Sequence, residues 1–237
     1  MTTKGKTNSI NKTARAAGFL YLLLAPLGFF SGMYIPSLTV PGDVVATANN
    51  IRASALLFRL SIVSSLATAI VTLLVALVLY KLLKPVNKAQ AVLMVVFALA
   101  AAPIGMLNEL NHFAVLLLLN GADYLKVFSV DQLHAQVMFF LNLHHYGSFI
   151  TQIFWGLWLF PMGYLVFKSG FLPRIIGVLL FIAGFGYVID SLVLFLLPGV
   201  IRTLSQFTFI GELLLLLWLL IKGVNVEEWE KRARESA

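Results

Sequence analysis

Residues 211–218 read GELLLLLW, a stretch that decides the class of fold because it sets one carboxylate, Glu212, among residues that are uncharged and mostly apolar. Five further stretches of the chain are also apolar enough to cross a bilayer. Hydrophobic residues make up 60% of the 237 positions and charged residues only 11%, which is far from the composition of soluble domains. The sequence therefore predicts an all-α integral membrane protein, in which Glu212 opposes membrane insertion by about 2.5–3.5 kcal/mol.

Hydropathy predicts six transmembrane helices in a single polytopic domain that covers residues 1–237. The predicted spans lie at about 14–35, 53–83, 89–119, 147–167, 175–197 and 203–221, and residues 222–237 form a short cytoplasmic tail. The first span is expected to be an uncleaved anchor, because no small-x-small cleavage motif accompanies it. For the tail, the sequence indicates a short charged helix or a disordered end, solvated in either case.

Two short amphipathic helices are predicted on the outer side of the membrane. One follows the turn Pro41-Gly42-Asp43 and leads into the second span, with Asp43 or Thr47 as its cap. The other covers residues 130–145 and leads into the fourth span, which begins near Gly147.

The basic residues lie mainly on one side of the predicted spans. Of the 17 lysines and arginines, 13 flank the ends expected to lie inside: Lys4, Lys6, Lys12, Arg15, Lys81, Lys84, Lys88, Lys168, Arg174, Lys222, Lys231, Arg232 and Arg234. The others are Arg52, Arg59, Lys126 and Arg202. By the positive-inside rule, both termini are expected in the cytoplasm and the protein in the cell (inner) membrane. Topology thus explains the net charge of +7, so the lipid bilayer is the expected partner and nucleic acid is not.

Polar side chains set into the spans predict a pocket that faces outward. Counting about 1.5 Å per residue from the basic inner ends puts Glu212 near the middle of the membrane and Asp190 in the outer leaflet. The same count puts five further residues at the outer interface: Arg59, Glu109, His112, His144 and His145. These seven residues are the predicted ligand-binding candidates.

A divalent metal is one ligand that this pocket could take. Glu109 and His112 are three residues apart and share a helical face, the spacing by which helix bundles present a carboxylate and an imidazole to one ion. His144 and His145 point about 100° apart, so at most one of them lines the pocket. With Asp190 they could supply the three or four ligands of zinc or manganese, and Glu109, His112 and His144 are the chosen set. The alternative is a polar helix end at the interface, with His112 solvated or bonded to a neighbour.

Glu212 and Asp190 also allow roles that need no metal. An acid buried in a membrane either pairs with a cation or takes part in proton or substrate handling. Arg59 is a cation within reach of the predicted pocket, and Arg202 is another candidate partner. The chain has no cysteine, which excludes disulfides, thiolate metal sites and cysteine nucleophiles.

Several motifs together resemble a family of bacterial multi-pass membrane proteins that is catalogued as a domain of unknown function. The resembling stretches are PGD (41–43), TANNI (47–51), FWGLWLFP (154–161), SGFLPR (169–174), GVLL (177–180), GE (211–212) and WLLIKG (218–223). The resemblance implies a six-span membrane protein, and it puts Glu212 and the outer segment around residues 49–50 inside family motifs. It implies no catalytic residue.

The leading hypothesis is a membrane protein whose outward-facing polar pocket binds a small or lipid-like ligand. The alternatives are a metal-assisted membrane enzyme that uses the outer histidine and glutamate cluster, a proton-coupled transporter that uses Glu212, and a non-catalytic membrane scaffold. The sequence leaves open whether the protein is an enzyme, which ligand it binds and how many copies assemble.

Overall fold

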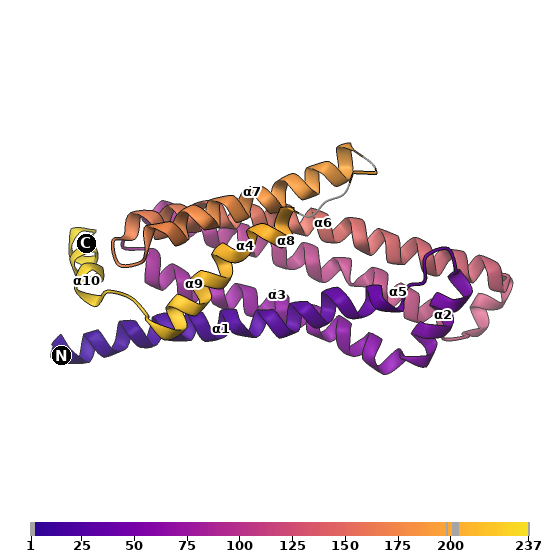
Figure 1. Cartoon of the computed structure of the whole chain (residues 1–237). Coiled ribbons are helices and arrows are strands. Elements are labelled where there is room, and N and C mark those ends of the chain that lie inside the picture. The colour runs from indigo at the N-terminus through magenta and orange to yellow at the C-terminus, as the bar shows by residue number, and fades with distance from the viewer. Residues whose placement is uncertain (1–2, 198, 201–203, 237) are drawn as a thin grey trace. The chain divides into compact units, whose positions relative to one another are not determined.

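The computed structural model describes residues 3–197, 199–200 and 204–236, and these residues are almost entirely helical (Figure 1). Arg202 and the predicted start of the sixth span at Thr203 lie outside the described residues. The helices are α1 (Thr3–Leu38), α2 (Val44–Ala53), α3 (Ala55–Leu83), α4 (Lys88–Asn108), α5 (Leu110–Leu119), the 3-10 helix η1 (Asp123–Val127), α6 (Val130–Ser169), α7 (Arg174–Leu196), α8 (Leu204–Thr208), α9 (Ile210–Ile221) and α10 (Val226–Glu235). The described residues contain no β-strand, so the all-α prediction is confirmed.

Six helical segments of the described chain are long and apolar enough to cross a membrane, as predicted. They are Ser9–Leu38, Ala55–Leu83, Lys88–Leu119, Val130–Ser169, Arg174–Leu196 and Leu204–Ile221. Their length and apolar composition require a lipid bilayer around them, because water would not tolerate so much exposed hydrocarbon. The chain is therefore a multi-pass helical membrane protein.

The outer helix predicted at 130–145 and the fourth span predicted at 147–167 form one helix, because α6 runs without interruption from Val130 to Ser169. Gly147, which lies at the start of the predicted fourth span, allows the Asn108 side chain to pack against the helix backbone. A Cβ atom at this position would come within 2.0 Å of the side-chain oxygen of Asn108. Since no proline precedes Pro161 in this helix, nothing in the sequence interrupts its backbone hydrogen bonds here.

The short helices near the ends of the spans have local causes. Asp43 caps α2 as predicted, because its side-chain oxygen accepts a hydrogen bond from the Ala46 backbone N–H at 2.8 Å. The C-terminal tail takes the helical alternative and forms α10. The indole N–H of Trp229 donates to the Leu82 carbonyl at 2.8 Å, which attaches this otherwise polar helix to the end of α3.

The helices divide into two compact units. The first unit comprises Met1–Leu23, Val71–Ala102 and Phe149–Ala237, and the second comprises Leu24–Ile70 and Pro103–Ser148. Helices α7–α10 belong to the first unit, whereas α2, α5 and η1 belong to the second. Helices α1, α3, α4 and α6 contribute residues to both.

In the first unit, glycines bring α6 and α7 into backbone contact. A Cβ atom on Gly177 would lie 2.7 Å from the Gly163 carbonyl oxygen, and one on Gly156 would lie 2.8 Å from the Gly184 carbonyl oxygen. Any larger side chain at these positions would force the helices apart. Small residues at helix crossings are the usual basis of packing in membranes, where hydrocarbon gives no drive for helices to associate.

In the second unit, a hydrophobic core joins α1, α2, α3, α5 and α6. Its buried members are Ile35, Ile51, Phe58, Ile62, Val115, Leu118, Leu125 and Val137. The core brings α5 and α6 together with α3, and these three helices carry the histidines and serine of the site described next.

Candidate metal centre

A buried polar cluster lies in the second unit, where α4 passes into α5. Glu109 occupies the single position between these helices, His112 lies one turn later on α5, and His144 lies on α6. Glu109 and His112 are each only 4% exposed. A carboxylate and one imidazole are thus withdrawn from solvent, and the second imidazole, on His144, is partly exposed.

The carboxylate of Glu109 is shared between the two histidines. Its Oε2 lies 2.9 Å from His112 Nδ1, and its Oε1 lies 3.0 Å from His144 Nε2. When each of these nitrogens carries its hydrogen, both oxygens accept an N–H···O bond. The ligating atoms of all three residues lie within 4.8 Å of one another, which is close enough for a single ion to reach each of them.

The two imidazole rings are held in a defined orientation. The His112 and His144 rings stack with their centroids 3.5 Å apart and their planes inclined by 26°. Phe58, a fully buried residue of α3, meets the His112 ring edge-on at 5.5 Å. Stacking on one side and an aromatic contact on the other restrict the rotation of His112.

Polar side chains support the cluster from two further sides. The Ser65 hydroxyl donates a hydrogen bond of 2.6 Å to Glu109 Oε1. The Asn108 amide donates to the His144 carbonyl at 2.8 Å and to the Ser148 hydroxyl at 3.2 Å. Ser65 therefore orients the carboxylate, and Asn108 fixes the stretch of α6 that carries His144.

Two predicted members of the pocket belong to the same unit but lie outside this cluster. The structure selects His144 from the histidine doublet, because His145 is exposed and its ring packs edge-on against Tyr146. Arg59 is also exposed, and within the part of the chain that the structure describes it forms no ion pair with an acidic side chain. The cluster thus contains three of the seven candidates.

Asp190 belongs to the first unit and has a structural partner there. Its Oδ2 accepts hydrogen bonds from the Ser205 backbone N–H at 2.8 Å and from the Ser205 hydroxyl at 2.7 Å, and its Oδ1 lies 3.2 Å from the Leu204 nitrogen. These are the first N–H groups of α8, which have no partner within their own helix. Asp190 on α7 therefore caps α8 from a neighbouring helix.

Glu212, also in the first unit, is bound by two tyrosines. The Tyr187 hydroxyl donates to its Oε1 at 2.9 Å, and the Tyr21 hydroxyl donates to its Oε2. Trp158 meets the Tyr21 ring edge-on at 6.2 Å. Phenol hydroxyls supply hydrogens to the carboxylate from α1 and α7, so the arrangement links three helices through one acid on α9.

Sequence reasoning missed the residues that complete both clusters. Ser65, Tyr21 and Tyr187 carry no local signal, since each becomes informative only when packing brings it to a glutamate far away in the chain. His134 was also missed, because it was one polar residue within the amphipathic outer helix expected at residues 130–145. It is only 3% exposed, and neither ring nitrogen has a hydrogen-bond partner among the residues described.

The fold and the site define a multi-pass helical membrane protein with a buried glutamate–histidine cluster. The chain belongs to the family described as "Domain of unknown function (DUF4386)", which matches residues 16–223 and so includes both glutamate clusters. This confirms the resemblance found in the sequence motifs.

A relative with a similar sequence comes from an archaeon. The chain is 34% identical to an uncharacterized protein of Archaeoglobus fulgidus over 168 residues, which cover 71% of this chain and 86% of the relative. Since this relative is archaeal, the bacterial origin implied by the resemblance stays a prediction. No solved structure matches the chain.

Proposed function

We propose that this protein is a membrane metalloprotein, in which Glu109, His112 and His144 bind one divalent transition-metal ion. The ion then acts on a small or lipid-like ligand that enters its open coordination position. This proposal joins the predicted ligand pocket with the predicted metal-assisted enzyme.

A single observation carries the proposal, namely that three ligating atoms from two separate helical segments lie within 4.8 Å of one another. Metal–nitrogen and metal–oxygen bonds of about 2.0–2.2 Å would need only small movements to close around an ion at their centre. Two imidazoles and one carboxylate form the donor set of catalytic zinc sites and also of non-haem Fe²⁺ sites. Both metals are therefore candidates, and the choice between them is left to measurement.

The donor set has three members, so a tetrahedral ion keeps one position for water or ligand. The His144 side chain is 19% exposed, against 5% for His112 and for Glu109, and the ligand would approach from this more open side. A bound ion at this position would polarise a carbonyl or phosphoryl oxygen, or supply a metal-bound hydroxide near neutral pH. Ser65 would keep the Glu109 carboxylate oriented toward the ion.

When an ion binds, the hydrogen on each coordinating nitrogen must leave, either to the other ring nitrogen of a neutral imidazole or, from an imidazolium, to water. His112 Nδ1 and His144 Nε2, which face Glu109, would give up their hydrogen bonds to that residue and present lone pairs instead. Metal binding should therefore weaken as the pH is lowered, since protons compete for both nitrogens.

The first test is the metal content of detergent-purified protein by elemental mass spectrometry, together with the variants His112→Ala and His145→Ala. The expected result is about one ion per chain in the wild type and in His145→Ala, and near zero in His112→Ala. His145 is the matched control because it neighbours His144 but lies outside the cluster. A wild type that stays free of metal after exposure to Zn²⁺ and Fe²⁺ would contradict the proposal. The cluster would then only hold its helices together by hydrogen bonds, as expected of a scaffold.

A second candidate function is proton-coupled transport through Glu212. The observation that favours it is a carboxyl group inside a predicted span, with one tyrosine hydroxyl on each of its oxygens. Such a group could take up and release a proton as the helices move. Proton flux into proteoliposomes under an imposed pH gradient tests this role: equal flux with wild type and with Glu212→Gln would exclude it.

We further infer that both termini lie in the cytoplasm. The support is the distribution of basic residues and the even number of spans. Because the native chain has no cysteine, single introduced cysteines report topology without background. In intact cells, Tyr124→Cys should react with a membrane-impermeant maleimide and Lys231→Cys should not; the reverse pattern would overturn the orientation.

A further inference from the structure

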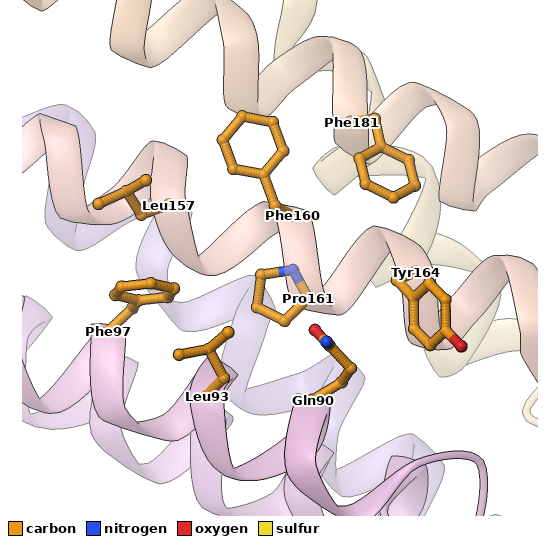
Figure 2. Close-up of a pocket in the computed structure, with 8 residues that line it drawn as sticks. All are labelled: Gln90, Leu93, Phe97, Leu157, Phe160, Pro161, Tyr164 and Phe181. Atoms are coloured by element: carbon orange, nitrogen blue, oxygen red, sulfur yellow. The ribbon is translucent and has the colours of Figure 1, made fainter.

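The first unit contains a cavity whose lining includes none of the residues of the metal centre. This cavity of about 380 Å³ is bordered by α4, α6 and α7 (Figure 2). Its lining consists of Gln90, Leu93, Phe97, Leu157, Phe160, Pro161, Tyr164 and Phe181. Six of these eight residues carry purely hydrocarbon side chains, so the cavity suits an apolar ligand. We call this cavity the α4–α6 groove.

The two polar residues lie at one end of the α4–α6 groove. On α4, the lining residues Gln90, Leu93 and Phe97 are three or four residues apart, so they form a stripe along one face of that helix. The lining residues of α6 within 157–164 form a similar stripe. Figure 2 shows Gln90 and Tyr164 together at one end, with Phe97 and Leu157 at the other. Each stripe covers eight residues, or seven steps of about 1.5 Å, which gives about 10 Å of helix. The groove therefore has a polar end and an apolar end.

Basic residues continue the groove beyond its polar end. Lys168 lies one turn after Tyr164 on the same stripe of α6, close to the end of that helix. Arg174 begins α7, two turns before Phe181, and its guanidinium lies 5.9 Å from the centre of the Phe167 ring. Both side chains are exposed.

These cations are not neutralised by ion pairs. Among the residues that the structure describes, neither Lys168 nor Arg174 lies within ion-pair distance of an acidic side chain. A third cation, Arg232 of α10, donates a hydrogen bond of 3.3 Å to the Lys168 carbonyl and also pairs with Glu235 at 3.4 Å. Lys168 and Arg174 therefore carry positive charge beyond the polar end of the groove, although the Glu228 carboxylate lies 3.9 Å from where a Cβ on Gly170 would be.

We infer that the α4–α6 groove binds an anionic phospholipid of the surrounding membrane. One acyl chain lies along Leu93, Phe97 and Phe160, and the phosphate lies between Lys168 and Arg174. An apolar channel ending in two unpaired cations matches an apolar chain ending in an anion, whereas a zwitterionic headgroup would gain less from the same cations. The inference does not depend on the metal centre, whose residues belong to the other unit.

The test is native mass spectrometry of the purified full chain with phosphatidylglycerol or phosphatidylcholine of identical acyl chains. The wild type should retain phosphatidylglycerol with an apparent affinity about tenfold above that for phosphatidylcholine, since each nearby cation favours an anionic headgroup. Leu93→Trp fills the groove and should lower retention of phosphatidylglycerol roughly tenfold. The matched control is Leu99→Trp, because Leu99 also lies on α4 but is 53% exposed and does not line the groove.

A second pair of variants tests the cations without changing the packing. Lys168→Gln combined with Arg174→Gln should remove most of the preference for phosphatidylglycerol, whereas Lys126→Gln combined with Arg59→Gln should leave it intact. All four of these residues are exposed, so the changes are not expected to affect folding. Equal retention of the two lipids by the wild type would overturn the inference. Equal losses for Leu93→Trp and Leu99→Trp would do the same.

Discussion

Each unit of this protein places one glutamate inside a predicted membrane span, and the two glutamates have different neighbours. Glu109 faces two imidazoles and one serine hydroxyl, whereas Glu212 faces two phenol hydroxyls. A neutral imidazole always has one ring nitrogen without hydrogen, whose lone pair can bind a metal ion, but a phenol keeps its hydrogen until about pH 10. The same acid therefore becomes part of a possible metal centre in one unit and a hydrogen-bonded link between helices in the other.

The two glutamates also differ in how far along the chain their hydrogen-bond partners lie. Glu109 and His112 are paired by local helix geometry, since residues three apart share a face. The partners of Glu212 are 191 and 25 residues away, on α1 and α7. One partner of Glu109 thus comes from its own helical segment, while both partners of Glu212 are brought to it by tertiary packing.

Breaking the metal ligands should give the largest contrast between the two glutamates. Glu109→Gln and His144→Ala are each expected to weaken Zn²⁺ binding by more than about 100-fold, because a three-ligand site loses a charged or nitrogen donor. Glu212→Gln should bind Zn²⁺ as the wild type does. Competition with a chromophoric chelator measures all three affinities. An equal loss in Glu212→Gln would mean that the effect is not local to the metal centre.

Removing the serine hydroxyl should have a smaller effect on the same site. Ser65→Ala is expected to lower Zn²⁺ affinity about 10–100-fold while leaving about one ion per chain at saturation, because Ser65 orients a ligand and is not one itself. Ser61→Ala is the matched control, since the Ser61 hydroxyl points to the Ser31 carbonyl oxygen at 3.5 Å and not to Glu109. Titration with the same chelator compares the two. An identical affinity for both variants would remove Ser65 from the site.

Substitutions of Glu212 should change the stability of the protein and not its metal content. Glu212→Ala leaves two partly buried tyrosine hydroxyls without an acceptor, which is expected to cost about 1–3 kcal/mol. Glu212→Gln keeps one carbonyl oxygen as acceptor and should cost less. Thermal unfolding in detergent measures both, with Glu235→Ala as a control at a position that is 51% exposed. Unfolding of Glu212→Ala at the wild-type temperature would show that the two hydrogen bonds do not hold the helices.

The smallest effects are expected from single tyrosines. Tyr21→Phe and Tyr187→Phe each remove one hydrogen bond to Glu212 and should each lower stability by about 0.5–1.5 kcal/mol. Because both bind the same carboxylate, the double variant should differ from the sum of the single ones. Strict additivity in thermal unfolding would indicate that the two hydroxyls act independently.

The six spans could be predicted from the sequence because their signal is local: about twenty consecutive apolar residues make a helix that can cross a bilayer. The extent of α6 could not. The sequence predicted an amphipathic outer helix at 130–145, in which the polar His134 is buried, and Gly147 packs against Asn108 within the same continuous helix. Whether a polar residue in such a segment faces solvent or a neighbour depends on helices that come from other parts of the chain.

For the candidate site, too, the sequence predicted what is local in the chain and not what depends on contacts between helices. The spacing of Glu109 and His112 identifies a pair that shares one helical face, whatever surrounds it. The choice between His144 and His145 required the packing of α6 against α5, and the role of Ser65 required α3. Asp190 was predicted as a ligand-binding candidate. Its oxygens cap α8 at the start of the sixth span, a contact that the sequence alone did not indicate.

X-ray absorption at the edge of the bound metal is the measurement that tests the metal centre most directly. After loading with Zn²⁺, the wild type should show scattering from two imidazoles, with nitrogen at about 2.0–2.1 Å, and from carboxylate or water oxygen at about 2.0–2.2 Å. One imidazole should be lost in His112→Ala and none in His145→Ala. A wild-type spectrum with oxygen ligands alone, or one that His112→Ala leaves unchanged, would contradict a centre built from Glu109, His112 and His144.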